Sequence, residues 1–477
     1  MRKITFLAFL ISPLLASAQI DFGSPSATAR GGSVTSSAKD WEAIEINPAN
    51  LGYSSNKKFT LTILNVGINL QDNQLTLNEI KNATYDSLTP ANRQQMYNAT
   101  TTPGGFNLNT NITWFALSFH IPKIGGLAIS LTDKEYSHAF LATPFANVVD
   151  SGLQSAELGG GTTKYLGNSS YLNQLVQRFN GSVAGGYYYR ELNIDYGRKL
   201  FAINIPSAIK GGASFENSEY LDYSKKNSDT IKNYLTFYGG IGFKPVFGLA
   251  DMNSSITNGI LTTNATYVSE VKTPKSLYSP LGDIFHSVGR GYGVDIGLSA
   301  TYRNWKFGAS AIDLGVINWQ NNQIVSINIP DAMNNIISDS SYGLINKESI
   351  FKYLVQSGDG PNYTTQLPSK FRTGLSYQLT KGILLASDFV APLNTVEGNI
   401  INPYVSLSTQ INVFNYFDLG VGIATEKQFG YVVPAGVVLD FIGGSELFVG
   451  SNDVLAFIGN RDDHVISLNV GIRLIGF

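Results

Sequence analysis

The sequence predicts an all-β protein, a transmembrane antiparallel β-barrel of about 14 strands with an N-terminal plug and long extracellular loops. Hydrophobic residues make up 43% of the 477 residues and charged residues only 14%, which is little charge for a water-facing surface of this size. Beyond the N-terminus, no apolar run approaches the roughly 18 residues that a spanning helix requires. Apolar and polar residues instead alternate in segments of about 10 to 13 residues, which suits tilted membrane strands. A closed barrel then pairs every backbone group within lipid.

Residues 1–18 are typical of a secretory signal peptide. Arg2 and Lys3 give a basic start, an apolar stretch follows, and the small residue Ala18 precedes Gln19. We therefore expect export and a mature chain that begins at Gln19. The alternative is a buried N-terminal strand or helix, which the basic start and the short apolar core disfavour.

The last segment of the chain shows the alternation most clearly. Positions 466, 468, 470, 472 and 474 are Ile or another aliphatic residue, whereas 467, 469, 471 and 473 are Ser, Asn, Gly and Arg. Side chains alternate between the two faces of a strand, so one face suits lipid and the other a polar lumen. The chain ends on Phe477, an aromatic C-terminus typical of proteins that the outer-membrane assembly machinery recognises.

Two hairpins follow the same pattern. The segment from Tyr292 to Leu314 alternates, turns at Arg303 and Asn304, and resumes its apolar phase. The segment from 371 to 389 turns at positions 380–382. With the last strand and the further candidates we expect 14 to 16 strands in all. Bacterial barrels have an even number of strands, so one of the 15 candidates must be wrong or one strand has been missed, and the short 444–452 is the candidate we would remove. The further candidates are 57–70, 110–120, 124–135, 191–203, 209–223, 233–246, 401–412, 416–425, 428–441 and 444–452.

Aromatic and charged residues add two expectations about the wall. Seven aromatic residues near strand ends suit girdles at the membrane interfaces, namely Trp114, Tyr187, Tyr188, Tyr189, Tyr302, Trp305 and Tyr431. Five charged residues are expected to form an ion-pair network in the lumen, namely Glu135, Asp195, Asp295, Asp388 and Arg473.

Four long polar connections separate some of the strands, at about 71–109, 136–190, 247–289 and 317–368. We place them outside the cell, because these barrels have short turns on one side and long loops on the other. Short amphipathic pieces at 171–179 and 331–337 are expected to be helical. Loops of this length usually carry function.

Residues 19–55 differ from the rest of the chain. The segment is rich in small residues, lacks strand alternation, and precedes the barrel that we expect over 56–477, so it is placed to fold inward as a plug. It contains Arg30-Gly31-Gly32, then Trp41, then Asn47-Pro48-Ala49. An ordinary turn is the alternative for Asn-Pro-Ala, because both Asn and Pro favour turns.

This pattern resembles the start of the FadL/TodX family of outer-membrane transporters for long-chain fatty acids and other hydrophobic compounds. In that family an Arg-Gly-Gly-like stretch precedes an aromatic residue, five further residues and Asn-Pro-Ala. The resemblance covers about 30 residues and implies a hatch inside a 14-stranded barrel. It implies that seven residues belong to the gating hatch: Arg30, Gly31, Gly32, Trp41, Asn47, Pro48 and Ala49.

Several chemistries find no support in the sequence. There is no cysteine, so disulfides and thiolate metal sites are excluded, and the four histidines lack ligand spacing. We find no nucleophile elbow, dinucleotide fingerprint or phosphate loop, and we expect neither an enzyme nor a cofactor. A dispersed Ser/His pair of a barrel hydrolase stays open. A formal charge of −2 gives no case for nucleic acid.

The functional hypotheses all place the chain in the outer membrane of a Gram-negative bacterium, in contact with lipid. The first is a transporter that passes a hydrophobic small molecule from the loops past the hatch and out through the wall or the lumen. Its ligand pocket would include Phe140, Leu141, Phe145 and Val148. The second is an accessory or scaffold subunit that binds an outer-membrane protein complex. The third is a diffusion porin, which the hatch-like N-terminus disfavours.

Overall fold

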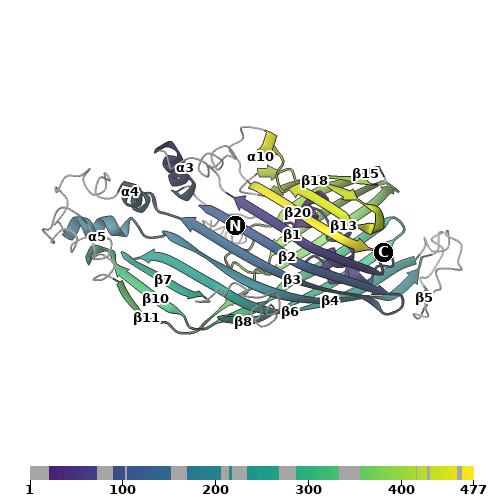
Figure 1. Cartoon of the computed structure of the whole chain (residues 1–477), viewed down its shortest axis with the longest axis horizontal. Coiled ribbons are helices and arrows are strands. Elements are labelled where there is room, and N and C mark those ends of the chain that lie inside the picture. The colour runs from purple at the N-terminus through teal and green to yellow at the C-terminus, as the bar shows by residue number, and fades with distance from the viewer. Residues whose placement is uncertain are drawn as a thin grey trace, which may run out of the picture.

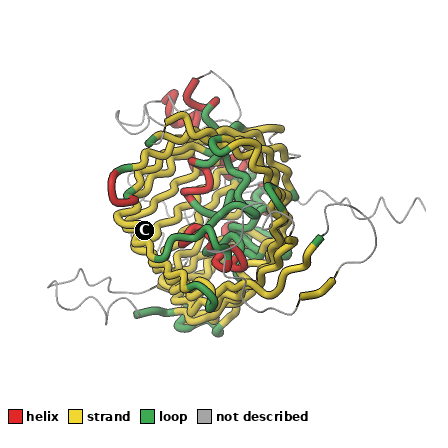
Figure 2. The backbone as a smooth tube through the Cα atoms, turned by 90° about the vertical axis from the view of Figure 1, so that its right-hand side faces the viewer, coloured by secondary structure: helices red, strands yellow, loops and turns green. Residues whose placement is uncertain are grey.

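The computed structural model describes residues 21–71, 90–101, 105–151, 169–205, 214–216, 234–267, 286–331, 355–414, 416–426, 430–458 and 465–477. The expected signal peptide, residues 1–18, and the expected new N-terminus at Gln19 lie outside the described residues. Within them the chain is mostly strand, and the strands form a ring that encloses the remaining N-terminal residues (Figures 1 and 2).

Fourteen strands of the described chain form the wall, each antiparallel to its neighbours in the ring. The ring closes because β1 pairs with β2 on one side and with β20 on the other, with Val66 opposite both Ile112 and Val470. The predicted 14-stranded antiparallel barrel is confirmed. In ring order the strands are β1 (Phe59–Gln71), β2 (Phe106–Ile121), β3 (Gly125–Phe140), β4 (Val183–Asn204), β6 (Tyr234–Thr257), β8 (Gly289–Tyr302), β9 (Trp305–Trp319), β13 (Lys370–Thr380), β14 (Ile383–Pro392), β15 (Tyr404–Phe414), β16 (Phe417–Glu426), β18 (Ala435–Asp440), β19 (Glu446–Ser451) and β20 (Val465–Gly476).

The two ends of the barrel differ. Tight turns join β2 to β3, β8 to β9 and β13 to β14 at one end, where β1 also begins and β20 ends. We call this the short-turn end and the opposite one the loop end. Figure 1 shows additional elements beyond the wall, most of them at the loop end. They are β5 (Ser214–Glu216), β7 (Ile260–Tyr267), β10 (Gln323–Asn328), β11 (Val355–Asp359), β12 (Tyr363–Gln366), β17 (Gly430–Val432), α3 (Pro90–Thr101), α4 (Thr143–Ser151), α5 (Ser169–Gln177), α10 (Leu455–Ile458) and the 3₁₀ turn η6 (Ile442–Gly444).

The two faces of the wall separate as the alternation predicts. On β8, Ile296 and Leu298 are 50% and 60% exposed, whereas Asp295 and Ser299, which flank this pair, are buried. On β20, Leu468, Ile472 and Leu474 are exposed and the intervening polar residues are buried. Apolar side chains exposed all around a closed ring require lipid rather than water, so the chain is a transmembrane barrel of the outer-membrane type.

The described helices are short. No helix in the described ranges is long and apolar enough to cross a bilayer.

Some predicted boundaries are wrong. The least certain candidate, 444–452, contains the genuine strand β19, whereas of the candidate 209–223 the structure describes only 214–216, which form β5. The predicted loop 247–289 begins inside β6, which continues to Thr257 and pairs with β7 as a hairpin. β4 and β6 have 22 and 24 residues, more than the roughly 10 that cross a membrane, because their loop-end parts still pair with neighbouring strands. The predicted helix at 171–179 is confirmed as α5, and most of 331–337 lies outside the described residues.

The exposed apolar band gives a first prediction. Ile296→Arg places a charge on the lipid face midway along β8, and we expect it to destabilise the folded barrel by about 2–4 kcal/mol. Thr257→Arg, on an exposed residue at the loop end of β6, is the matched control and should have little effect. Urea titration of folding into lipid vesicles measures both. Equal stability of the two variants would contradict the assignment of this face to lipid.

Candidate functional site

Residues 21–55, the N-terminal segment, lie within the ring of strands (Figure 2). The segment runs from the loop end, where Asp21 pairs with Lys370 at the start of β13, to the short-turn end, where β1 begins. It forms the helix α1 (Pro25–Ala29) and the 3₁₀ turns η2 (Asp40–Ala43) and η3 (Pro48–Gly52). Helix α1 begins at an N-cap, Ser24, whose hydroxyl accepts from the Ala27 N–H at 3.3 Å.

The Arg30-Gly31-Gly32 motif ends α1 and fixes it to the wall. The Arg30 guanidinium lies 3.0 Å from the Glu42 carboxylate of η2 and 3.4 Å from that of Glu446 on β19. Gly31 and Gly32 have φ of 85° and 90°, a region that favours glycine. A side chain on Gly31 would also collide with the Val421 backbone of β16. The motif therefore combines an ion pair with a turn that passes close to the wall.

Trp41 lies on the same side of the lumen. Its ring is buried and stacks on Phe448 of β19, with ring centroids 6.3 Å apart. It belongs to the core cluster that contains Ala29 and Val438. Trp41 is therefore a packing contact between the segment and the wall.

Asn47, Pro48 and Ala49 contact the opposite wall. The Asn47 side chain caps η3 by accepting from the Ala49 N–H at 3.1 Å, and it donates to the Ser299 hydroxyl of β8 at 2.9 Å and to the Leu298 carbonyl at 3.2 Å. Ser299 in turn donates to Asn50 at 2.6 Å. The structure therefore brings the seven predicted residues into two contact regions, Arg30, Gly31, Gly32 and Trp41 beside β16 and β19, and Asn47-Pro48-Ala49 beside β4, β6 and β8.

A third contact region involves Ser33 to Ser36. The Asp388 carboxylate of β14 accepts from the backbone N–H groups of Val34 and Thr35 at 2.8 and 2.9 Å, and from the Thr35 hydroxyl at 2.8 Å. The hydroxyls of Ser33 and Ser406 lie 2.8 Å apart. Asp388 is thus one of the predicted lumen charges, but its partners are the N–H and O–H groups of the segment.

Wall glycines let the segment approach this closely. A Cβ on Gly240 of β6 would overlap the Pro48 and Ala49 backbone, and one on Gly297 of β8 would overlap the Asn47 side chain. A Cβ on Gly308 of β9 would meet Asn47 and the Ser36 backbone at about 3 Å. These glycines face inward, so the inner face of the wall is complementary in shape to the segment.

Between these contacts lies a buried charge network. The Lys134 ammonium of β3 is 3.0 Å from Glu45 of the segment and 3.0 Å from Glu191 of β4. Lys244 of β6 is fully buried, 3.0 Å from Asp295 and 2.5 Å from Asp313. Removing one member would leave a buried charge without its partner, which is costly. Of the predicted lumen charges, Asp195, Asp295 and Arg473 are buried, whereas Glu135 is exposed.

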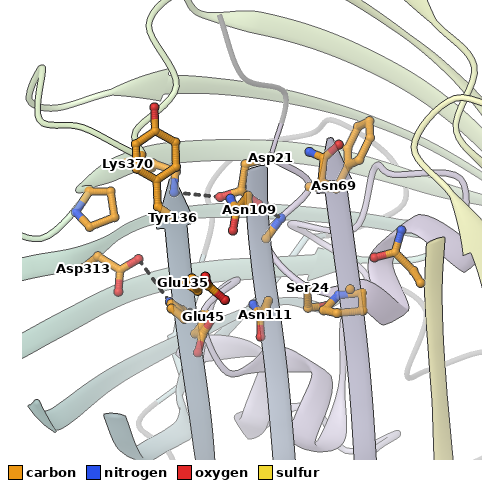
Figure 3. A pocket seen from close by; sticks show the side chains of 18 of the residues that line it. Asp21, Ser24, Glu45, Asn69, Asn109, Asn111, Glu135, Tyr136, Asp313 and Lys370 are labelled. Carbon is orange, nitrogen blue, oxygen red and sulfur yellow. Dashed lines mark hydrogen bonds and ion pairs between the residues drawn. The ribbon is translucent and has the colours of Figure 1, made fainter. Parts of the chain in front are cut away.

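A cavity of about 80 Å³, the lumen cavity, lies on the loop side of the N-terminal segment (Figure 3). Asp21, Ser24 and Glu45 of the segment line it together with Asn109, Asn111 and Lys370 of the wall. The Asp21 carboxylate lies 2.7 Å from the Lys370 ammonium. Burial alone raises the pKa of Asp21, but the charges of Lys370 and Arg372 outweigh burial and hold the pKa well below its usual range.

A larger cavity of about 740 Å³, the loop-end cavity, lies further out. It shares Tyr187, Tyr189 and Pro368 with the lumen cavity, so the two adjoin. Its lining combines tyrosine rings and aliphatic side chains with amides and two carboxylates, which is typical of a small-molecule site. The remaining lining residues are Asp251, Asn253, Asn264, Ile317, Asn322, Ile324, Pro361, Tyr363, Thr364, Thr365, Gln366, Leu367, Thr395, Val396 and Glu397.

Two predictions about this region are wrong. Phe140, Leu141, Phe145 and Val148 do not line either cavity; Phe145 and Val148 pack on a cluster around Leu172 and Phe179 that holds the loop helices together. Tyr187 and Tyr189 are not girdle residues, because they line the lumen. Their neighbour Tyr188 donates to Asp133, as does the exposed Trp114. The alternation along β4 predicts this difference, because it places Tyr188 on the opposite face of the strand from Tyr187 and Tyr189.

Most of the residues that line the loop-end cavity could not be predicted from the sequence. Tyr363 and Gln366 lie in the short strand β12, inside a stretch predicted to be a loop, and Glu397 lies in the connection between β14 and β15. In neither place does a clear alternation in the sequence predict which way a side chain points. The described residues hold no group of three His, Cys, Asp or Glu side chains that could bind a metal ion.

The fold and the lumen define the class of protein: an outer-membrane β-barrel whose N-terminal residues occupy its interior. A family described as a family of unknown function, DUF5723, matches residues 220–452. No curated protein matches.

The chain is also similar to several solved structures. They include the toluene transporter TodX of P. putida (10% identity, 97% of each chain covered, TM-score 0.42) and a Pseudomonas aeruginosa FadL homologue (9% identity, 96% of this chain and 98% of that chain, TM-score 0.44). The translocator domain of the autotransporter NalP from Neisseria meningitidis is also similar (8% identity, 87% and 88% covered, TM-score 0.30). The assignment of the barrel rests on the strand pairings of this chain.

The inward glycines predict how the segment can be displaced. Gly240→Ala adds a methyl group against the Pro48–Ala49 backbone, so we expect the segment to shift from the wall. Ser36→Cys reports this shift, because it introduces the single cysteine of the chain at a buried position that a reagent reaches only when the segment moves. Maleimide should label Cys at position 36 at least about tenfold faster when Gly240→Ala is present.

Gly239→Ala is the matched control, since a Cβ there meets the side chain of Leu200 at 3.1 Å rather than the segment. It should leave the labelling rate at its original value. Equal labelling of both glycine variants would show that the segment does not depend on close contact with β6.

Proposed function

We propose that this barrel carries an apolar or amphipathic small molecule across the outer membrane, and that the N-terminal segment is the plug that gates its passage. The observation that carries the proposal is the pair of adjoining cavities. The loop-end cavity leads through Tyr187 and Tyr189 to the lumen cavity, whose floor is formed by Asp21 to Thr28 of the segment. The resemblance of Arg30-Gly31-Gly32 and Asn47-Pro48-Ala49 to a transporter hatch supports it.

The wall favours a route through the lumen over a route between strands. Each neighbouring pair of described wall strands is hydrogen-bonded, and the irregularities between β1 and β20 or β2 and β3 are local bulges. Opening the wall would leave backbone N–H and C=O groups without partners in lipid, which costs several kcal/mol for each group. The plug contacts are individually weaker, about 1 kcal/mol for a typical hydrogen bond. Opening a path by moving the plug therefore requires less free energy than opening the wall.

The contacts of the seven predicted hatch residues support the gating role that we propose for them. Arg30, Gly31, Gly32 and Trp41 hold one side of the plug to β16 and β19, while Asn47, Pro48 and Ala49 hold the other to β6 and β8. A ligand passes when one side is released. No covalent bond opposes this release, since the chain contains no cysteine.

A disulfide that locks the plug tests the proposal. Ser33→Cys with Ser406→Cys joins the plug to β15, where the native hydroxyls lie 2.8 Å apart. We expect cells carrying the oxidised double variant to take up the apolar dye N-phenyl-1-naphthylamine no faster than cells that lack the barrel. Reduction with dithiothreitol should restore the wild-type rate.

Ser254→Cys with Thr263→Cys is the control lock. It joins β6 to β7 in the loops, across hydroxyls 2.9 Å apart, without touching the plug. Dye uptake should be the same with this lock oxidised or reduced. If the plug lock also leaves uptake at the wild-type rate, the plug does not gate transport and the proposal fails.

A further inference from the structure

The loop-end cavity has an unusual charge composition. Of its 18 described lining residues, two are acidic, Asp251 and Glu397, and none is lysine or arginine. A cavity that receives a carboxylic acid would be expected to offer a cation to the ligand carboxylate. This lining offers the opposite charge.

Neither carboxylate is neutralised by a lysine or arginine of the described chain. The Glu397 carboxylate accepts from the Asn253 amide at 3.0 Å and lies 3.5 Å from the His138 ring nitrogen Nε2. The Asp251 carboxylate accepts from the Tyr363 hydroxyl. Both acids are thus held in place by neutral donors and keep their charge available to a ligand.

Aromatic rings complete the lining. Tyr187 and Tyr189 lie side by side on β4, with ring centroids 5.5 Å apart, and Tyr136 continues the row at 5.6 Å from Tyr187. Tyr363 stacks on Trp319 at 6.4 Å on another side of the cavity. The faces of such rings attract organic cations, and quaternary ammonium groups are commonly bound by aromatic cages.

The lumen cavity continues the same balance. Its lining contains four acidic residues, Asp21, Glu45, Glu135 and Asp313, against two lysines. With Asp251 and Glu397 the two cavities together have six acidic and two basic lining residues. Most of the acidic residues of the lumen cavity are paired with a lysine: Glu45 with Lys134, Asp21 with Lys370, and Asp313 with Lys244. The lumen cavity therefore offers no unpaired lysine to an anion, and the acidic side chains of the loop-end cavity, which no described lysine or arginine neutralises, carry the inference.

We propose that the loop-end cavity binds an organic cation, an amine or quaternary ammonium group attached to an apolar body, in preference to a neutral or anionic analogue. Glu397 and Asp251 supply the negative charge and the tyrosine rings supply the apolar and cation-binding faces. This inference rests on the proposed function, because it names the substrate class of the same cavity.

Matched probes test the charge preference directly. Calorimetric titration of the purified full barrel in an uncharged detergent compares benzyltrimethylammonium, benzyl methyl ether and phenylacetate, which share an aromatic body and differ in charge. We expect the cation to bind at least about tenfold more tightly than phenylacetate, with the ether between them. Equal or tighter binding of phenylacetate, or binding of none of the three, overturns the inference.

Variants locate the site. Glu397→Gln should weaken binding of benzyltrimethylammonium at least about tenfold and leave that of the ether unchanged, and Asp251→Asn should act in the same direction. Asp331→Asn is the control, since Asp331 is an exposed residue just after β10 and does not line the cavity. Unchanged cation affinity in both Glu397→Gln and Asp251→Asn overturns the inference.

The pH dependence has a defined sign. Burial raises the pKa of Glu397, so its carboxylate protonates at a higher pH than an exposed glutamate does. Because protonation removes the negative charge, cation affinity should fall as the pH falls through this raised pKa, and Glu397→Gln should flatten that part of the profile. An affinity that rises on acidification would contradict the assignment.

Failure of this inference is distinguishable from failure of the proposed function. If the cation binds but the plug lock leaves dye uptake unchanged, the cavity binds cations and does not serve transport. If the lock blocks uptake but phenylacetate binds best, transport stands and the substrate class is wrong.

Discussion

The structure depends on one constraint: within lipid, every backbone N–H and C=O must find a partner inside the protein. The pairing of β1 with both β2 and β20 meets it by closing the wall. Because successive side chains of a strand point to opposite faces, the closed wall has one face toward lipid and one toward the lumen, with a row of inward positions on every strand. What the chain does is decided by the residues that it places at these inward positions.

Many of the inward positions serve the N-terminal segment. Gly240, Gly297 and Gly308 admit its backbone, while Asp388, Ser299 and Glu446 bind its polar groups. The contacts come from β6, β8, β9, β14 and β19, so they surround the segment rather than attach it to one side. Polar contacts that reach the segment from several strands at once favour a single position for it in the lumen. Between the segment and the loop end of the barrel, acidic and aromatic inward residues line the two cavities.

Much of this could be predicted from the sequence, and the rest could not for a physical reason. The period of two in 466–474 and around Arg303 predicts strands and their faces correctly, because lipid and lumen impose opposite chemistries on successive residues. The same logic separates Tyr188 from Tyr187 and Tyr189 once the strand is known. Glu397 lies in a connection and Tyr363 in the short strand β12, which pairs with the loop-end part of β9. The pairing of distant segments decides their place, and a single sequence does not contain that information.

The central claim is that the N-terminal segment occupies the lumen and closes it at rest. Ion conductance of the wild-type barrel, inserted singly into a planar lipid bilayer without ligand, tests this claim most directly. If the segment closes the lumen, no continuous water path crosses the barrel at rest, so we expect no steady conductance. A stable open channel in each insertion would contradict the account, because it would show that the lumen is open while the segment is in place.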